Sequence, residues 1–157
     1  MKHLFLLAFT LMTFVCFSQK KKEIKKLGIK SQVVTETVNG KVINDSKTVY
    51  DKNGQITEDW NYDKDGHLKS ITKYTYNKDG NVFEEYEYDG KNVLKEKRVM
   101  KYDLMEQKTE EQFLDGSGKQ IKKHLFTYTA NGLKSEKKVY DANNVLISTK
   151  KYTYTTK

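Results

Sequence analysis

The sequence predicts an all-β protein, an antiparallel meander of about ten strands built from tandem hairpin repeats of 26 residues. The first observation is a turn at residues 63–66, Asp-Lys-Asp-Gly, which follows the aromatic pair Trp60 and Tyr62 and has relatives along the chain. The second is that the residues before these turns alternate at intervals of 12 and 14, namely Tyr50, Tyr62, Tyr76, Tyr88, Tyr102, Leu114, Tyr128, Tyr140 and Tyr154. The third is the presence of 11 tyrosines and the absence of proline, which suits strands because proline removes a backbone donor from the ladder.

Residues 1–18 have the pattern of a signal peptide. A charged start precedes an apolar run over residues 4–15, which is too short to span a bilayer comfortably, and cleavage after Ser18 fits the small residues there. The alternative is a lipoprotein signal acylated on Cys16, but the bulky Val15 stands where such signals need a small residue. We therefore expect an exported protein, periplasmic or secreted, that is not anchored through Cys16.

Residues 19–30 form a basic N-terminal arm with six lysines and one glutamate, a net charge of +5. Without residues 1–18 the chain has 28 basic and 21 acidic residues, a net charge of +7, so the repeats themselves are close to neutral at +2. Such an arm is either a solvated linker or a device that steers the domain to an anionic envelope surface. The residues for the second role are Lys20, Lys21, Lys22, Lys25 and Lys26. We expect no nucleic-acid partner, since the repeats are near neutral and export removes the chain from cytoplasmic DNA and RNA.

Residues 31–157 form the β-repeat domain, in which each interval reads as a strand of about eight to ten residues and a turn. The pattern Asp-x-(Asn/Asp)-Gly favours a type I turn closed by a glycine bulge, in which Asp caps the turn and Gly takes a positive φ. We expect turns centred near residues 39, 53, 65, 79, 91, 105, 117, 131 and 143, and helix only before Ser31. Asn92 and Asn144 replace glycine with the next best residue for positive φ, whereas Glu106 departs from the rule.

In this geometry the residue before each turn pairs with the residue six positions later. Five pairs are aromatic on aliphatic, namely Tyr50 with Ile56, Tyr62 with Leu68, Tyr76 with Val82, Tyr88 with Leu94 and Tyr140 with Leu146. The other three hairpins place polar residues opposite the anchors, so we expect altered bulges near Lys108, Gln120 and Lys134. Counting outward from the turns sets Glu85 opposite Lys97, which predicts cross-strand ion pairs on the solvated faces.

Aromatic residues gather at even positions. In a steady register they share one face of the sheet, because side chains two residues apart point the same way. The candidate binding face comprises Trp60, Tyr62, Tyr74, Tyr76, Tyr86 and Tyr88, and it continues in Phe126, Tyr128, Tyr152 and Tyr154. This face is either the buried side of a curled sheet or an exposed platform for glycans or a partner protein. After residue 104 apolar residues also occupy odd positions, which leaves both faces open as the buried one.

The composition limits how the sheet is covered. With 36% hydrophobic and 32% charged residues, the chain has too little apolar material for a thick core, and sheet pairing must supply much of the stability. We expect an open, curled sheet. The alternative is a closed up-and-down barrel, since about ten strands suffice and closure removes exposed edges.

The repeat resembles a known bacterial pattern. Tyr-Asp-x-x-Gly-x-Leu at residues 62–68, followed by Tyr-Thr-Tyr-Asn-Lys-Asp-Gly at residues 74–80, resembles the tyrosine-aspartate (YD) repeats of bacterial Rhs-type proteins. It is more distantly similar to the MORN-variant repeats of small exported bacterial proteins. The resemblance covers roughly residues 36 to 154. It implies a long, rolled sheet that encloses or displays other parts, with no catalytic residues in the repeat itself.

No residue pattern indicates catalysis, a cofactor or a metal. Asp63 and Asp65 share the look of a calcium loop but lack the downstream acidic ligand of an EF-hand, and His67 and His124 have no second ligand at a useful spacing. Cys16, the only cysteine, leaves with the signal peptide, so no disulfide and no cysteine ligand or nucleophile is expected. We therefore expect no catalytic, cofactor-binding or metal-ligating residues, no cofactor and no enzyme activity.

The expected function is that of an exported, non-catalytic interaction or structural module in the bacterial cell envelope or outside the cell. Its sheet face or edge strands would bind a protein or an envelope polymer. The alternative is a ligand-binding β-barrel, whose interior aromatic residues would hold an apolar or sugar ligand.

Overall fold

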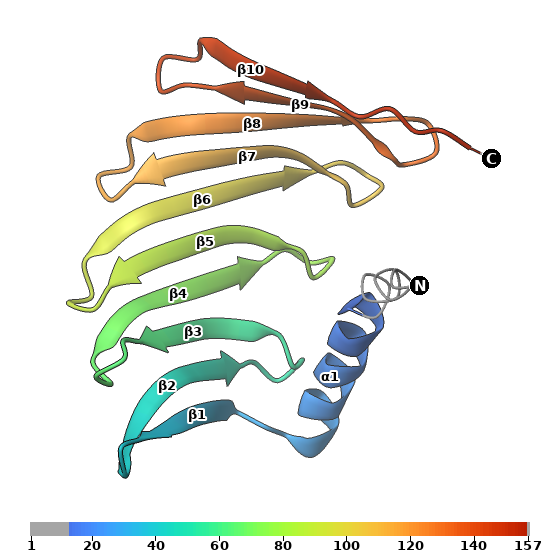
Figure 1. The fold of residues 1–157 in the computed structure, drawn as a ribbon. Helices are drawn as coiled ribbons and strands as arrows, with labels where there is room; N and C mark the ends of the chain where they lie inside the picture. The colour runs from blue at the N-terminus through green and yellow to red at the C-terminus, as the bar shows by residue number, and fades with distance from the viewer. Residues whose placement is uncertain (1–12, 157) are drawn as a thin grey trace, which may run out of the picture.

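Ten strands form one antiparallel sheet in the order β1 to β10, each strand hydrogen-bonded to the next along the sequence (Figure 1). The computed structural model describes residues 13–156 of the chain. The strands are β1 (Ser31–Val38), β2 (Lys41–Tyr50), β3 (Ile56–Tyr62), β4 (Leu68–Tyr76), β5 (Val82–Asp89), β6 (Leu94–Tyr102), β7 (Lys108–Asp115), β8 (Gln120–Tyr128), β9 (Lys134–Tyr140) and β10 (Leu146–Lys151). Helix α1 (Thr13–Leu27) precedes them. The all-β meander predicted from the sequence is confirmed.

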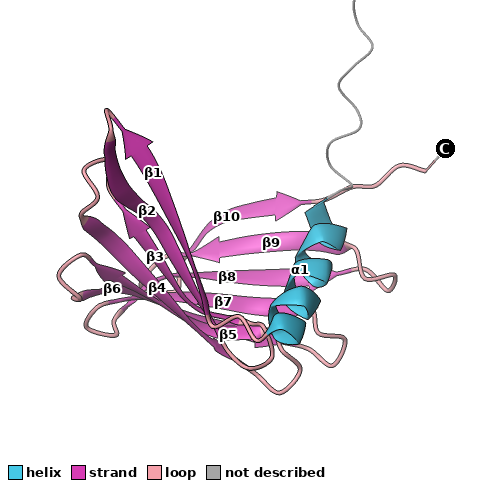
Figure 2. Ribbon diagram, turned by 90° about the horizontal axis from the view of Figure 1, so that it is seen from below, coloured by secondary structure: helices cyan, strands magenta, loops and turns pink. Residues whose placement is uncertain are grey.

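The sheet is open. Among the described residues, β1 pairs with β2 alone and β10 with β9 alone, so the first and last strands are edges. Seen from below, the sheet is strongly curled, and β1 and β10 lie on separate arms of the curl (Figure 2). The closed barrel that we weighed as an alternative is therefore wrong, and the open curled sheet is confirmed.

The eight hairpins from β2 to β10 repeat one turn. In the first of them the Gly54 amide donates to the Asp51 carbonyl oxygen at 3.0 Å, and the Asp51 amide donates to the Gln55 carbonyl oxygen at 2.8 Å. All nine turn centres lie where the spacing predicts them. Where another residue replaces the turn glycine, it still takes a positive φ, as at Asn92, Glu106 and Asn144. The β1–β2 turn differs, with positive φ at both Asn39 and Gly40, as a type I′ turn requires.

Each of these eight hairpins carries one extra residue on its outgoing strand. Tyr88 pairs with Leu94, but the next pair is Glu87 with Glu96, so Lys95 has no partner across the strands. The five aromatic–aliphatic pairs predicted from the sequence are all present. Because a bulge bends its strand and increases the local twist, eight of them in succession account for the curl of the sheet.

The same bulge occurs in the three hairpins where we expected an altered one. The anchors there pair with polar residues, namely Tyr102 with Lys108, Leu114 with Gln120 and Tyr128 with Lys134. Our expectation was wrong because the turn residues alone determine the bulge, whatever side chains meet across it. In the second of these hairpins Ile121 becomes the extra residue, and its side chain is 42% exposed.

The bulges also shift the predicted ion pairs by one residue. Glu85 lies opposite Arg98, not Lys97, and the two charged groups are 3.1 Å apart. Lys97 lies opposite Tyr86 and reaches Glu84 diagonally at 2.7 Å. Cross-strand ion pairs are therefore present, but our residue-by-residue assignment was wrong because it counted past the turn without the extra residue.

Helix α1 spans the expected cleavage position and the basic arm. The helix ends at Leu27. Gly28 follows with a φ of +64°, and the Ile29 amide donates to the Ile24 carbonyl oxygen at 3.1 Å. Ile24 is 7% exposed. Downstream, the Tyr50 amide donates to the Lys30 carbonyl oxygen at 2.9 Å. The arm is therefore a docked helix and not the solvated linker that we considered, whereas residues 1–12 of the predicted signal peptide lie outside the described range.

The core is thin, as the composition predicts. Eight residues of the described range are buried, namely Ile24, Tyr50, Gly54, Ile71, Met100, Phe113, His124 and Phe126. No described side chain falls below 2% exposure, so no layer of the molecule is fully enclosed. No helix among the described residues is long and apolar enough to cross a membrane.

Candidate functional site

The strand register divides the predicted aromatic face between the two sides of the sheet. Trp60 pairs with Ile71 and Ile71 with Tyr88, so these three lie on one side, called here the Trp60 face. Tyr74 pairs with Glu85 and belongs to the opposite side. In β3 and β5 the Trp60 face thus holds residues with even numbers, and in β4 it holds residues with odd numbers. The parity changes from strand to strand because each bulge adds one residue and shifts the register by one.

The six residues of the predicted binding face therefore do not form one surface. By alternation along each strand, the Trp60 face holds Trp60, Tyr62, Tyr86 and Tyr88, and the opposite face holds Tyr74 and Tyr76. The same rule places Phe126 and Tyr128 of β8 on the opposite face. The expectation of a single aromatic face was wrong because it assumed a steady register across the hairpins.

The Trp60 face carries lysines over aromatic rings. The Lys47 ammonium lies 4.8 Å from the centroid of the Trp60 ring, and the Lys97 ammonium lies 4.9 Å from that of Tyr86. Each ring also binds a carboxylate two residues earlier on its own strand. The Trp60 indole N–H donates to Glu58 at 2.8 Å, and the Tyr86 hydroxyl donates to Glu84 at 2.7 Å. Each cation–π contact at a partly exposed site is worth about 0.5–1 kcal/mol. The pattern is an amphipathic surface whose charges and rings contact one another.

The opposite face, called here the Phe113 face, gathers the larger buried cluster. His124 lies between Phe113 and Phe126, with ring centroids 4.7 and 6.2 Å away, and both pairs are edge-to-face. The His124 ring nitrogen Nδ1 lies 3.1 Å from a carboxylate oxygen of Glu111. Four lysines, Lys108, Lys122, Lys134 and Lys137, lie over the two phenylalanine rings. Sequence reasoning missed this cluster because its members belong to one face only once the bulges are counted.

Burial controls the titration of this cluster. Burial lowers the pKa of His124 and outweighs its hydrogen bond to Glu111, which acts in the opposite direction. Burial alone would raise the pKa of Glu111, but its contacts with Lys108 and His124 hold that pKa below its usual value. At neutral pH the imidazole is therefore uncharged and the carboxylate is ionised, so the pair serves as a structural hydrogen bond.

A second polar group lies further along the Phe113 face. The Tyr74 hydroxyl donates to Asp59 at 3.4 Å, and the Thr48 hydroxyl donates to the other oxygen of the same carboxylate at 2.8 Å. Burial raises the pKa of Tyr74, and the charges of Asp59 and Glu85 raise it further. Burial also raises the pKa of Glu85, against the charge of Arg98. Tyr74 and Thr48 thus share the Asp59 carboxylate as acceptor, and Glu85 pairs with Arg98 at 3.1 Å.

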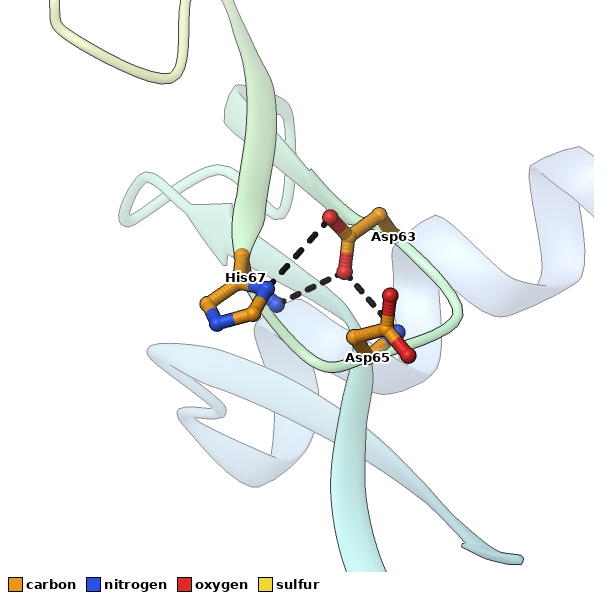
Figure 3. A group of neighbouring side chains, drawn as sticks. All are labelled: Asp63, Asp65 and His67. Carbon is orange, nitrogen blue, oxygen red and sulfur yellow. Dashed lines mark hydrogen bonds and ion pairs between the residues drawn. The ribbon is translucent and has the colours of Figure 1, made fainter.

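Three potential metal ligands meet at the turn between β3 and β4. Ligand atoms of Asp63, Asp65 and His67 lie within 4.8 Å of one another (Figure 3). One oxygen of Asp63 accepts from the backbone amides of Asp65 and His67 at 2.9 Å each, and these bonds lower the pKa of Asp63. Asp141 makes the same two bonds in a turn that has neither a second acid nor a histidine. The grouping is therefore a consequence of turn geometry.

The lysines of the arm are ordered on α1. Lys20, Lys21, Lys22, Lys25 and Lys26 are all exposed. Helical periodicity places Lys21 and Lys25 on one flank of the buried Ile24, and Lys22 and Lys26 on the far side. Lys21, Lys22 and Lys25 line a groove of about 460 Å³ beside the turns of the β2–β3 and β4–β5 hairpins.

Comparison with known proteins identifies no family. No protein-family model matches the chain, and no curated protein matches it. Among solved structures, a protein of unknown function from Bacteroides fragilis NCTC 9343 is similar with a TM-score of 0.45 and 15% identity, covering 81% of this chain and 95% of that one.

Two further solved structures are of larger chains, each of which matches this chain in part. TarM is similar with a TM-score of 0.33 and 12% identity over 86% of this chain. A mutant of S. aureus TarM in complex with fondaparinux, alpha-GlcNAc-glycerol and UDP gives a TM-score of 0.32 at 12% identity over 85% of this chain. The chain spans 23% of the length of either TarM structure.

Proposed function

We propose that the chain is an exported, non-catalytic β-repeat protein that acts as an interaction or structural module in the bacterial cell envelope or outside the cell. The observation that carries this proposal is an open sheet with two unpaired edges where exposed apolar side chains gather. The resemblance of the repeat to YD repeats supports it, since that pattern implies a sheet without catalytic residues. The ligand-binding barrel is not proposed, because the sheet does not close.

The apolar side chains concentrate at the two ends of the sheet. Of the fifteen large hydrophobic residues that are exposed in the described range, eight lie on or beside β1, β2 and β10. They are Val33, Val34, Val38, Val42, Val145, Leu146, Ile147 and Tyr154. Exposed apolar groups beside a row of unpaired backbone donors and acceptors form a template for another strand.

The β1 edge is the better docking surface of the two. Every residue of β1 is exposed, and Glu36 is its single charged residue. Strand β10 contains Lys150 and Lys151, and lysines on an edge strand discourage further pairing. We therefore assign β1 as the strand to which an extended segment of a partner protein adds, with backbone hydrogen bonds for affinity and the valines for side-chain contact.

A fractionation experiment tests export. The full chain, carrying a C-terminal tag, is expressed in a bacterial host, and the cytoplasmic, periplasmic and medium fractions are separated. The expected product lies outside the cytoplasm and begins at Gln19. A chain that stays in the cytoplasm with its first residues intact would contradict the export part of the proposal.

Edge-blocking variants test docking at β1. Val33→Lys combined with Thr37→Lys places charges on the edge strand, and Thr75→Lys places one on the exposed surface of the central strand β4 as a control. Proteins cross-linked to the purified chain in an envelope fraction are compared by mass spectrometry. We expect the double variant to lose the cross-linked partner and the control to keep it. If the double variant keeps the same partner in the same yield, β1 is not the docking edge.

A further inference from the structure

The groove beside α1 combines a strong positive charge with a fixed geometry. Its cationic rim consists of Lys21, Lys22 and Lys25 from the helix and Lys78 from the β4–β5 turn. Asp79 is the one acidic residue that lines it, so the lining carries a net charge of +3. None of the four lysines makes an ion pair with another residue in the range 13–156.

The helix that carries three of these lysines is held in place. Gly54 meets the helix so closely that a Cβ added there would lie 2.5 Å from the carbonyl oxygen of Lys21 and 3.5 Å from Cβ of Ile24. Ile24 is buried at this contact, and the arm is tied to the sheet again through Lys30. Gly54 therefore allows the helix backbone to contact the turn directly, and this contact fixes the positions of Lys21 and Lys25.

The opposite wall of the groove is also fixed. The Gln55 side-chain amide donates to the Gly80 carbonyl oxygen at 3.1 Å and joins the β2–β3 turn to the β4–β5 turn. This bond holds Lys78 at a constant place relative to the helix. Asn53, on the same wall, contributes an amide that makes no side-chain hydrogen bond within the described part of the chain.

We propose that this groove binds a phosphate group. Four lysine ammonium groups and an amide suit a compact dianion, since lysine recognises phosphate as a point charge and a phosphate carries a charge near −2 at neutral pH. The phosphate comes either from a soluble phosphate compound, which carries this higher charge, or from an anionic lipid headgroup, whose phosphodiester carries one negative charge. Both present phosphate oxygens to the lysines. The inference goes beyond the docking function of β1 and does not depend on it.

Two matched pairs of lysine substitutions test the site. Lys21→Gln with Lys25→Gln removes two charges inside the groove, and Lys20→Gln with Lys26→Gln removes two charges from the same helix outside it. Binding of the chain, as purified from cells, is measured with pyrophosphate by calorimetry. It is measured with vesicles of phosphatidylcholine, with and without phosphatidylglycerol, by co-sedimentation. We expect the inner pair to weaken binding by at least about tenfold and the outer pair to change it about twofold or less.

The two probes distinguish the sources of the phosphate. Binding to pyrophosphate alone assigns a soluble ligand, binding to anionic vesicles alone assigns a headgroup, and either result supports the groove. Equal losses from the inner and outer pairs would mean that α1 acts only through its total charge and would overturn the proposal. Absence of binding to both probes at low salt would also overturn it.

A glycine variant separates geometry from charge. Gly54→Ala keeps every lysine but forces the helix away from the turn, whereas Gly118→Ala introduces the same strain at a positive φ with no atom within 4 Å of the new Cβ. We expect Gly54→Ala to weaken phosphate binding and Gly118→Ala to leave it unchanged. If Gly54→Ala binds as the unsubstituted chain does, the docked helix is not needed and the proposed site is wrong.

Discussion

The hydroxyl of Tyr76 donates a 2.6 Å hydrogen bond to the carbonyl oxygen of Ile56, the first residue of the neighbouring strand β3. The same bond recurs every 26 residues, from Tyr102 to Val82, from Tyr128 to Lys108 and from Tyr154 to Lys134. Tyr76, Tyr102 and Tyr128 each precede a turn and also bind the strand before their own, and Tyr154 makes the same bond from the segment after β10. From Tyr76 onward, every second anchor makes this bond, so the 26-residue spacing of these tyrosines also serves to join neighbouring strands.

Removal of one such hydroxyl should destabilise the sheet. Tyr102→Phe deletes the donor to the Val82 carbonyl oxygen, and we expect the free energy of unfolding to fall by about 1 kcal/mol. Tyr62→Phe is the control, because the Tyr62 hydroxyl makes no side-chain hydrogen bond to another residue in the described range. Urea denaturation measures both. Equal losses in the two variants would show that the bond adds no stability.

Gly90 allows two turns to stack. A Cβ at this position would lie 2.1 Å from the Leu68 carbonyl oxygen, and a backbone atom cannot swing away as a flexible side chain can. We expect Gly90→Ala to cost about 2–3 kcal/mol. Gly118 takes a positive φ at the turn position that Asn92 occupies in its own turn. Gly118→Asn should therefore cost less than about 0.5 kcal/mol. The account of turn stacking fails if thermal denaturation ranks the two variants in the opposite order.

Glu106 is a position where the chain tolerates strain. Its φ is 60° in the place that glycine occupies in most of the turns. Glu106→Gly should raise the free energy of unfolding by about 1 kcal/mol, since glycine adopts this conformation without a steric penalty. The lost contact from the Asn81 amide is long, at 3.4 Å, and exposed. Asn92→Gly is the comparison, and its free energy of unfolding should rise by less. A larger rise for Asn92→Gly than for Glu106→Gly would contradict the strain at Glu106.

Tyrosine ionisation should weaken the fold at high pH. Burial, with the charges of Asp51 and Asp59, raises the pKa of Tyr76 to about 12, from 10.0 in a free tyrosine. The folded state favours the neutral hydroxyl of Tyr76. The stability that this hydroxyl contributes is therefore complete below pH 10 and is lost as the pH rises toward 12. The slope of unfolding free energy against pH in this interval should therefore be shallower in Tyr76→Phe. Parallel slopes would show that Tyr76 does not titrate differently in the two states.

Local patterns in the sequence predict most of the fold. The turns and the anchor pairs follow from Asp and Gly at fixed offsets, because a type I turn with a glycine bulge depends on only a few neighbouring residues. The two faces were assigned wrongly for one reason, the extra residue in each bulge, which moves Tyr74 to the side opposite Tyr86. That shift was already implied by the turn type.

The remaining features depend on contacts between distant parts of the chain. The docking of α1 rests on Ile24 against Gly54, a pair that no periodicity connects. The cluster of His124 with Phe113 and Phe126 forms because β7 and β8 bring these residues to one face. A sequence reading that counted one extra residue per hairpin would have found this cluster, but it would not have found the helix contact.

Hydrogen exchange, read amide by amide, tests the open sheet most directly. Strands β2 to β9 have a partner on both sides, so their amides should be protected, whereas β1 and β10 each have one unpaired edge. We predict that every second amide of β1 and of β10 exchanges far faster than the amides of the central strand β5. Protection of β1 and β10 equal to that of β5 in the isolated monomer would mean that the two edges pair with each other, and it would contradict both the open sheet and docking at β1.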